Sequence, residues 1–461
     1  MSYYPGFPFA NPRLIRIFGL LLVMITLVLV PLLDQANAQR QNRLPLVRDA
    51  EIENLIRDYT APIFKAGGLG RNGVEVFLLN RNSFNAFVTG TRMFLHTGAI
   101  MQADTPNEII GVMAHETGHI VGGHLVRLRD RLEKAQILSV LSLLAGAGAA
   151  AAGSPEAGAA IATGGGSAIQ RNILRYQREE EIAADRTGLT LLNKTKQSGK
   201  GMLTTFKKLG TNPLFSSGRL DPYTLSHPLP RQRIALLQQS VEKSPYFKKK
   251  DPQNLQLRHD LARAKIAAYA GGASLVRNVL GKKLNGPAGT YGIAISHFLS
   301  GVPRKGVKLM DQLVSKQPNN PYFHEMRGEM LLRWGKPVEA AKSFRKATAL
   351  DKNSGLLKIQ LGHALIQTNN KANLDEAIKT LKLGLSRDKY SSRGYGYLAR
   401  AYAAKGDRVL AIAATAEEKF LQGNLKEAKQ FAKRAMPGLK KGSPQWLRLQ
   451  DIIGYAPLSR G

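Results

Sequence analysis

The segment Ala114-His115-Glu116-Thr117-Gly118-His119 decides how the rest of the chain is interpreted. His115 and His119 are four residues apart, so on an α-helix they lie on one face, one turn apart. Two imidazoles placed in this way can bind one zinc ion, and Glu116 then points close enough to a water at the metal to take its proton. Apolar residues at helical spacing precede the motif, so we expect it on a helix. The alternative is a pair of helix histidines that face a solvent cleft.

Length and composition narrow the class of protein. A chain of 461 residues predicts two or three domains, and 43% hydrophobic residues suffice for ordinary cores. Cysteine is absent, so disulfides and thiolate chemistry are excluded, and a metal site must use histidines and carboxylates. The formal net charge of +33 points to a polyanionic neighbour, such as anionic lipid, nucleic acid or an acidic protein, or serves solubility alone.

The N-terminal residues have the three parts of a secretory signal. Arg13 and Arg16 precede an apolar run over 17–33, and Ala36-Asn37-Ala38 follows as an A-x-A cleavage pattern. We therefore expect a signal peptide over residues 1–38, cleaved after Ala38. The alternative is an uncleaved anchor.

Several short elements are expected between the signal and the motif. Apolar positions at helical spacing predict a helix over 48–60, which Pro62 bends or ends. Residues 74–79 read as a strand, and two more short strands follow over 84–90 and 92–98, leading into the motif helix.

The last of these strands is our candidate for binding substrate. In zinc proteases of this general kind an extended substrate pairs with a strand along the cleft. We expect this role for the residues Met93, Phe94, Leu95 and His96. The alternative is a plain hairpin that closes the core.

His124 follows the motif closely but is not expected to bind the metal. We expect the motif helix to continue through Gly122, Gly123 and His124, which places His124 about half a turn from His115. We interpret it as a residue behind a ligand or at the edge of the cleft, so the third ligand must lie elsewhere.

The segment Arg178-Glu179-Glu180-Glu181-Ile182-Ala183-Ala184-Asp185 offers that ligand. A helical carboxylate completes a His, His, Glu site and leaves one position for water. Three glutamates compete, but Asp185 lies one turn after Glu181 and can hold a ligating histidine through its outer nitrogen. This favours Glu181 as ligand and Asp185 as its support. The alternative is an exposed acidic turn that begins a helix.

A further histidine occurs in Leu225-Ser226-His227-Pro228, with Arg233 close behind. His227 reaches the cleft in one of two roles: it stabilises the oxyanion of the tetrahedral intermediate, or it binds zinc and blocks the water site. The alternative is an exposed loop histidine.

Residues 138–169 are almost uncharged and rich in Ala and Gly. Ser154-Pro155-Glu156 divides them into two arms, each too short to span a bilayer. We expect a helical hairpin that acts as a lid, as a loop that touches a membrane, or as a mobile plate over the cleft. The alternative is a buried helix pair.

A period of about 34 residues begins beyond a domain boundary at 250/251, which is typical of tetratricopeptide repeats. In one copy the small and large positions are Gly328, Leu331, Ala340, Phe344 and Ala347. Adding 34 gives Gly362 and Leu365, and the second helix of that copy is shifted by three more residues, to Ala377 and Leu381. Stacked helix pairs of this kind bind protein segments; the alternative is a helical bundle without a binding role.

Taken together, these motifs resemble the metallopeptidase family of HtpX and the CAAX prenyl endopeptidases, and within it the soluble periplasmic BepA-like branch. The resemblance rests on His115-Glu116-x-x-His119, Arg178-x-x-Glu181-x-x-x-Asp185, Ser226-His227-Pro228 with Arg233, and Asn85-Ala86-Phe87. It covers essentially the whole chain. Gln177 departs from it, since many members have Ser before the Arg.

The resemblance implies one zinc ion per chain on His115, His119 and Glu181, with Glu116 as the catalytic base. It also implies a supporting Asp185, a regulatory or substrate-side His227, and quality control of outer-membrane proteins from the periplasm or the outer membrane. The expected fold is α+β and mostly helical: a gluzincin-type zinc protease domain over 39–250 and an α-solenoid of tetratricopeptide repeats over 251–461.

Two functions of different classes follow. The first is a zinc endopeptidase whose repeats hold protein substrates or the outer-membrane assembly machinery, with membrane-surface contact through 138–169. The second is a non-proteolytic periplasmic chaperone or scaffold with a latent zinc site. The intact Glu116 argues against the second, since a structural site needs no base beside the metal. Nucleic-acid binding has no motif and conflicts with the signal peptide.

Overall fold

The fold is taken from a computed structural model that describes residues 44–70, 73–151, 154–211 and 222–456. The chain divides into two compact units, 1–46 and 47–461. The predicted signal peptide over 1–38 and its cleavage site lie outside the described residues. The second unit holds every element discussed below, apart from Leu46 at the start of the first strand.

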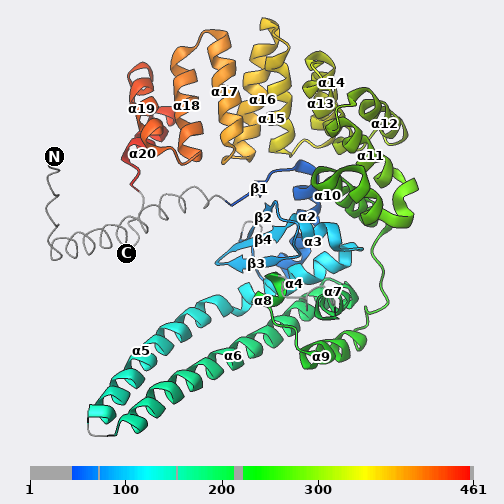
Figure 1. Cartoon of the computed structure of the whole chain (residues 1–461). Helices are drawn as coiled ribbons and strands as arrows, with labels where there is room; N and C mark the ends of the chain where they lie inside the picture. The colour runs from blue at the N-terminus through cyan, green and yellow to red at the C-terminus, as the bar shows by residue number, and fades with distance from the viewer. Residues whose placement is uncertain (1–43, 71–72, 152–153, 212–221, 457–461) are drawn as a thin grey trace, which may run out of the picture. The chain divides into compact units, whose positions relative to one another are not determined.

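The first half of this unit combines a small sheet with helices (Figure 1). Its elements are β1 (Leu46–Val47), α2 (Ala50–Ala66), β2 (Glu75–Leu79), β3 (Ala86–Thr89), β4 (Arg92–His96), α3 (Thr97–Gln102), α4 (Pro106–Gly122), α5 (His124–Ala151), α6 (Pro155–Lys194), α7 (Lys200–Thr211), α8 (Pro222–Ser226) and α9 (Arg231–Glu242).

The four strands have the order β1-β2-β4-β3. β4 pairs in parallel with β2 on one side and antiparallel with β3 on the other. Both edges of β4 are therefore occupied, and the expectation that a substrate pairs with Met93, Phe94, Leu95 and His96 is wrong. β1 and β3 are the two edge strands of the described sheet, and β1 has only two residues. β3 is therefore the edge that offers an extended peptide a strand of four residues.

α2 is longer than the sequence pattern predicts. It begins after Asp49, whose carboxylate accepts a hydrogen bond from the Ile52 N–H (2.9 Å), and it runs through Pro62 to Ala66. Pro62 does not end the helix because the next residues, Ile63 and Phe64, are buried in the core. Their burial offsets the backbone hydrogen bond that proline removes.

The motif helix is α4, which begins after Thr105 with Pro106 at its first turn. α3 stands between β4 and α4, so the strand does not lead directly into the motif helix. α4 crosses α6 very closely, since a Cβ at Gly118 would lie 2.6 Å from the Ala184 carbonyl oxygen. Glycine at 118 therefore lets the backbones of the His115–His119 helix and the Glu181–Asp185 helix approach each other.

The helix does not continue through Gly123 to His124, in contrast to the expectation. Gly123 has φ +66°, a left-handed conformation that suits glycine, and its N–H bonds to the Ile120 carbonyl. α5 starts anew at His124. The turn brings the His124 ring back against His119, with 4.9 Å between ring centroids.

α5 and α6 form the predicted helical hairpin and lie side by side in Figure 1. It is no buried helix pair, because most side chains of its outer half are exposed. Among the described residues, no helix is long and apolar enough to cross a membrane.

The described part of the second half, up to residue 456, contains helices but no strand. Its elements are α10 (Gln253–Leu280), η2 (Gly281–Asn285), α11 (Pro287–Leu299), α12 (Pro303–Lys316), α13 (Pro321–Arg333), α14 (Pro337–Leu350), α15 (Gly355–Gln367), η3 (Lys371–Asn373), α16 (Leu374–Arg387), α17 (Ser392–Lys405), α18 (Arg408–Leu421), α19 (Leu425–Ala435), η4 (Met436–Gly438) and α20 (Pro444–Gly454).

From α11 onward, consecutive helices pack as antiparallel pairs, which confirms the predicted helical repeats. The small and large positions meet as expected. A Cβ at Gly328 would lie 2.9 Å from the Phe344 ring, and both residues are buried. Gly362 packs on Leu381 in the same way in the next pair.

α10 begins close to the proposed domain boundary at 250/251, which stays a prediction. Its buried polar residues bond to the first half: His259 Nδ1 lies 2.9 Å from the Tyr59 hydroxyl, and Arg263 Nε donates to the Met101 carbonyl (3.1 Å). One apolar core extends from Ile52 to Ala377. The repeats thus share a core with the first half.

Candidate active site

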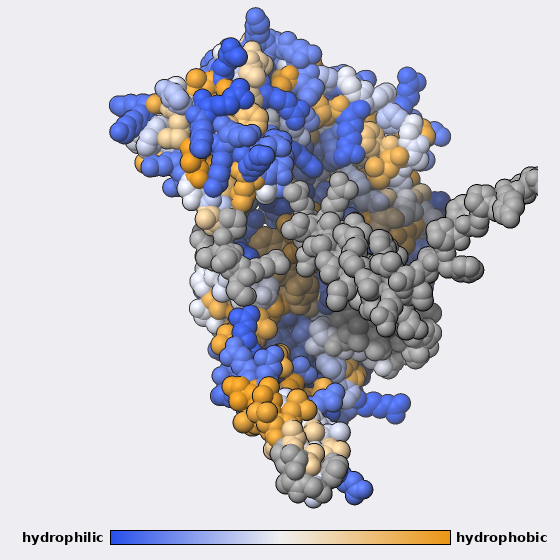
Figure 2. All heavy atoms as spheres, turned by 60° about the vertical axis from the view of Figure 1, so that its left-hand side comes forward, coloured by the Kyte–Doolittle hydropathy of each residue, from blue (hydrophilic) through white to orange (hydrophobic). Residues whose placement is uncertain are grey.

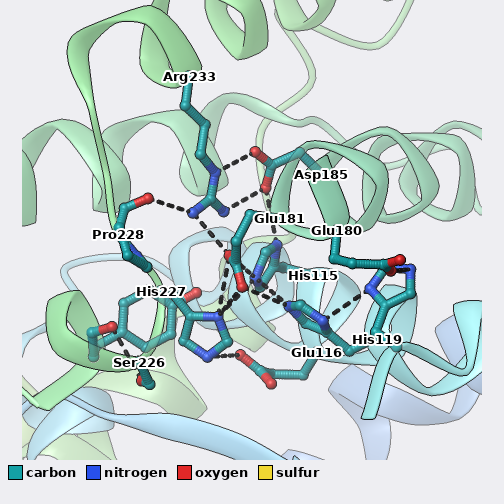
Figure 3. Close-up of polar contacts among 12 residues, drawn as sticks. His115, Glu116, His119, Glu180, Glu181, Asp185, Ser226, His227, Pro228 and Arg233 are labelled. Carbon is teal, nitrogen blue, oxygen red and sulfur yellow. Dashed lines mark hydrogen bonds and ion pairs between the residues drawn. The ribbon is translucent and has the colours of Figure 1, made fainter. Parts of the chain in front are cut away.

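Four side chains from three elements converge at one point (Figure 3). His115 and His119 come from α4, Glu181 comes from α6, and His227 follows α8. Each offers one ligand atom, and these atoms all lie within 4.8 Å of one another. The structure thus brings together the three predicted ligands and His227, for which the sequence left zinc binding as one of two roles.

His115 is fully buried and held from behind. Its Nδ1 lies 2.9 Å from Asp185 Oδ1, so Nε2 faces the cluster. Arg233 in turn donates to Asp185 through Nε (2.7 Å) and Nη2 (2.8 Å), and its Nη1 lies 2.8 Å from Glu181. Burial opposes protonation of His115, but the hydrogen bonds to Asp185 and Glu181 outweigh it and raise the His115 pKa to about 9.

His119 has a second support of the same design. Its Nδ1 lies 3.0 Å from His124 Nδ1, and His124 Nε2 lies 2.8 Å from Glu180. Arg127 Nη2 donates to the same Glu180 carboxylate (2.7 Å). Each of the two histidines is therefore fixed through its Nδ1 by a series of hydrogen-bonded side chains that ends at an arginine. This orients Nε2 toward the cluster.

Glu181 is the glutamate that faces both helix histidines. One of its oxygens lies 3.4 Å from His115 Nε2 and the other 3.4 Å from His119 Nε2. Burial works against its ionisation, yet hydrogen bonds from His115 and His227 hold the Glu181 pKa far below its usual range. Glu180 bonds to His124 and Arg127 instead, and Glu179 forms an exposed pair with Arg175.

Glu116 lies beside the cluster, and its carboxylate is buried without a hydrogen bond to any described residue. It is fully buried, and neither oxygen has a hydrogen-bond partner among the described residues. Burial raises the Glu116 pKa, and the nearby His227 and His115 only partly counter this. The one ion-pair contact of Glu116 in the described part of the chain is with His227 Nε2, at 3.4 Å. A buried carboxylate without hydrogen bonds is costly, so its presence here favours a chemical role.

His227 closes the cluster from the opposite side. Its Nδ1 lies 3.0 Å and 3.2 Å from the two Glu181 oxygens, and Nε2 has no hydrogen-bond partner among the described residues. Tyr223, fully buried one turn earlier, packs its ring on His227 with 4.7 Å between centroids. His227 is buried, so it is not an exposed loop histidine.

A cavity of about 200 Å³ opens beside the cluster and includes Glu116, His119, Glu181 and His227 in its lining. The rest of the wall combines an apolar part, formed by Phe87, Val88, Leu125, Leu128 and Tyr176, with the polar residues His124, Gln177, Glu180 and Ser226. Phe87 and Val88 belong to β3, whereas no residue of β4 lines the cavity. His96 bonds to the Ser83 hydroxyl (3.0 Å), away from the cluster.

The side chains present fit a metal ion. Imidazole and carboxylate are ligands that zinc accepts. Three of the four converging atoms are imidazole nitrogens, and the fourth is a carboxylate oxygen. His119 Nε2 lies only 3.0 Å from His115 Nε2, so both nitrogens aim at one point. Burial and the neighbouring His115 lower the His119 pKa, which keeps this imidazole unprotonated and able to act as a ligand.

Comparisons with known proteins agree with this geometry. The model of peptidase family M48 matches residues 47–241, which include every residue of the cluster. Residues 47–241 form a peptidase family M48 domain. The M48 domain therefore combines a protease fold with a His/Glu cluster that can hold a metal ion.

Relatives extend beyond the M48 domain. The beta-barrel assembly-enhancing protease of Escherichia coli strain K12 is 26% identical over 425 residues, which cover 90% of this chain and 85% of the relative. The protein of the same name from Yersinia pestis is 25% identical over 423 residues, with the same coverage. The solved structure of YrrB, a tetratricopeptide-repeat protein, covers 38% of this chain with 17% identity and a TM-score of 0.31.

Sequence reasoning missed three features around the M48 site. Tyr223 gave no signal, because a single tyrosine before a His-Pro pair has no characteristic spacing. The link between His124 and Glu180 depends on the turn at Gly123, which re-aims His124. The edge position of β3 depends on strand order, and alternation along a strand does not reveal that order.

Proposed function

We propose that the chain is a zinc-dependent endopeptidase of the cell envelope that acts on outer-membrane β-barrel proteins. His115, His119 and Glu181 hold the metal, and Glu116 is the general base. The observation that carries this proposal is the convergence of three ligand atoms in an M48 domain, beside a buried Glu116 whose oxygens have no hydrogen-bond partner among the described residues.

Zinc on this ligand set would supply a Lewis acid, which would lower the pKa of a water enough for its deprotonation near neutral pH. The Glu116 carboxylate accepts the proton of that water and later donates it to the leaving amine nitrogen. Its low-dielectric surroundings raise its pKa, which suits a group that must hold a proton between the two steps. Asp185 and His124 keep the two helix histidines oriented throughout.

The substrate class is inferred from the relatives. Proteins named beta-barrel assembly-enhancing protease align with 90% of this chain, including its helical repeats. We assign the repeats to binding unfolded protein segments or a component of the outer-membrane assembly machinery. The sequence pattern of residues 1–38 supports export to the periplasm.

The extended substrate pairs with the open edge of β3. His96 N–H bonds to the Asn85 carbonyl, so Phe87 and Thr89 are the next residues that exchange hydrogen bonds with β4. Ala86 and Val88 therefore turn their backbone groups away from β4. Since Val88 also lines the cavity beside Glu116, a strand added at this edge enters the site.

A second candidate is a chaperone or scaffold with a closed metal site. The position of His227 favours it, because four ligands around zinc leave no place for water. The buried Glu116 favours the protease, since a structural site gives this carboxylate no role. Cleavage assays on a Glu116→Gln variant, set out in the Discussion, separate the two.

Metal analysis tests the ligand set directly. We expect one zinc per chain in the wild type. In Glu181→Gln we expect zinc to be lost or bound much more weakly. Glu179→Gln, an exposed neighbour on the same helix, is the matched control and keeps its zinc. Full zinc in Glu181→Gln, with thermal unfolding unchanged, would make Glu181 the wrong ligand.

A further inference from the structure

In the outer half of the α5–α6 hairpin, large apolar side chains are exposed to solvent. Large apolar side chains of α5 point into solvent: Ile137, Leu138, Val140, Leu141, Leu143 and Leu144 are each between 52% and 63% exposed. Figure 2 shows apolar side chains gathered at the lower end of the molecule, where this hairpin lies. A contiguous exposed apolar surface of this kind marks an interaction site.

The contact between the two helices is made by small residues instead. A Cβ at Gly146 would lie 2.6 Å from the Gly158 carbonyl oxygen and 3.1 Å from the Ala162 Cβ. A Cβ at Gly165 would lie 2.6 Å from the Ser142 hydroxyl. In water a helix pair buries its large apolar side chains, whereas helices surrounded by lipid pack through small residues and turn the large ones outward.

Charge changes sharply along the hairpin. From Ala135 to Gln170 the sequence has a single charged residue, Glu156. The segments next to the main body, 127–134 and 171–178, carry seven basic and two acidic residues. An apolar end followed by a basic collar matches the two layers of an anionic membrane, acyl chains beneath phosphate head groups.

The dimensions fit shallow insertion. The uncharged part of α5, Ala135–Ala151, is about 25 Å long at 1.5 Å per residue. The hydrocarbon core is about 30 Å thick, so this arm is too short to cross it. One leaflet is about half as thick, so the arm fits within it only when it lies strongly tilted or along the surface.

We propose that the α5–α6 hairpin is a membrane-docking device, with the apolar face of α5 inserted into an anionic bilayer and the basic collar at its head groups. The base of the hairpin supplies Leu125, Leu128 and Tyr176 to the cavity beside Glu116. Docking therefore holds the mouth of that cavity near the bilayer surface. The inference rests on the hairpin alone and does not require the proposed peptidase activity.

Vesicle flotation tests the docking. The protein is purified from the cell envelope with the N-terminus that export leaves, and mass spectrometry verifies that every variant has the same one. Vesicles contain phosphatidylcholine with or without phosphatidylglycerol. We expect the wild type to float with the anionic vesicles, and the Leu141→Glu/Leu144→Glu variant to bind at least about tenfold more weakly, because it places two charges on the inserted face.

A matched control carries Val338→Glu and Leu383→Glu, two similarly exposed apolar positions in the repeats. It should float like the wild type. Wild type that fails to float, or a Leu141→Glu/Leu144→Glu variant that floats equally well, overturns the proposal. The proposal is also overturned if neither protein floats and the wild type forms an oligomer that the Leu141→Glu/Leu144→Glu variant does not form. The apolar face would then be an interface between copies of the chain. Peptide cleavage, measured in parallel without vesicles, reports separately on the peptidase site.

Discussion

His227 Nε2 lies 3.4 Å from Glu116 Oε1, on the side of the cluster opposite the motif helix. The same imidazole contacts both oxygens of Glu181 through Nδ1. One side chain thus faces both the proposed base and a proposed ligand. We infer that His227 closes the site in this arrangement, between the proposed base and the proposed ligand Glu181.

Removing this imidazole should open the site. We expect His227→Ala to keep its zinc, because three ligands remain, and to cleave an unfolded protein several-fold faster than the wild type. Ser226→Ala, one residue away, serves as control. A His227→Ala variant that retains zinc but loses cleavage would support the other role, stabilisation of the oxyanion.

The series of contacts from His119 through His124 to Glu180 should influence the affinity for zinc. Because His124 orients His119 and Glu180 orients His124, we expect Glu180→Gln to weaken zinc binding about 10–100-fold. Competition with a chelator measures this. Glu179→Gln removes the same charge from a residue that does not contact His124, and it should leave zinc affinity unchanged. Equal zinc affinities in the two variants would show that His124 and Glu180 do not support His119.

The open edge of β3 can be blocked without unfolding the sheet. Val88→Pro deletes an N–H that points away from β4, and proline is tolerated on edge strands at such positions. We expect thermal stability close to that of the wild type and at least about tenfold slower cleavage of an extended substrate. Val88→Thr keeps the N–H and should cleave normally. Unimpaired cleavage by Val88→Pro would exclude strand addition at β3.

Stability should depend on pH through a histidine far from the metal cluster. His259 is fully buried between the Tyr59 hydroxyl and the Ala103 carbonyl, and burial lowers its pKa to about 3. Below pH 6.5 the unfolded chain therefore takes up a proton that the folded chain does not. The free energy of unfolding should fall as pH falls from about 6.5 toward 3, by about 2–3 kcal/mol between pH 6.5 and 4.5 from this group.

The matched variant is His259→Gln, which keeps a donor and an acceptor but cannot titrate in this range. Denaturant unfolding at the two pH values gives the comparison. We expect the wild type to lose about 2–3 kcal/mol more than His259→Gln over this interval. Identical losses would show that His259 does not titrate on unfolding.

Local periodicity was sufficient to predict much of this fold. The His115–His119 spacing and the one-turn offset between Glu181 and Asp185 are properties of single helices, and the sequence alone orients them. The repeats were predictable for a similar reason, since a small residue such as Gly328 must face a large one such as Phe344 in every copy. The structure brings the predicted metal ligands together, and their catalytic roles stay predictions.

Features that depend on tertiary arrangement were not predictable in this way. The substrate strand was misassigned because strand order is set by packing; the unbroken apolar run Met93-Phe94-Leu95 was in fact typical of a central strand. Pro62 does not end α2, because the burial of Ile63 and Phe64 carries the helix past it; the predicted bend stays a prediction. His124 was placed on a continuous helix, whereas Gly123 turns it back to His119.

The most direct test of the central claim compares wild type and Glu116→Gln for zinc content and for cleavage of an unfolded β-barrel protein. Glu116 binds no other described side chain strongly, so the variant should fold and keep one zinc per chain. We predict that cleavage falls by about 10²-fold or more, because the general base is lost. Equal cleavage by the two proteins, or no zinc in either, would contradict the assignment of this cluster as a metallopeptidase site.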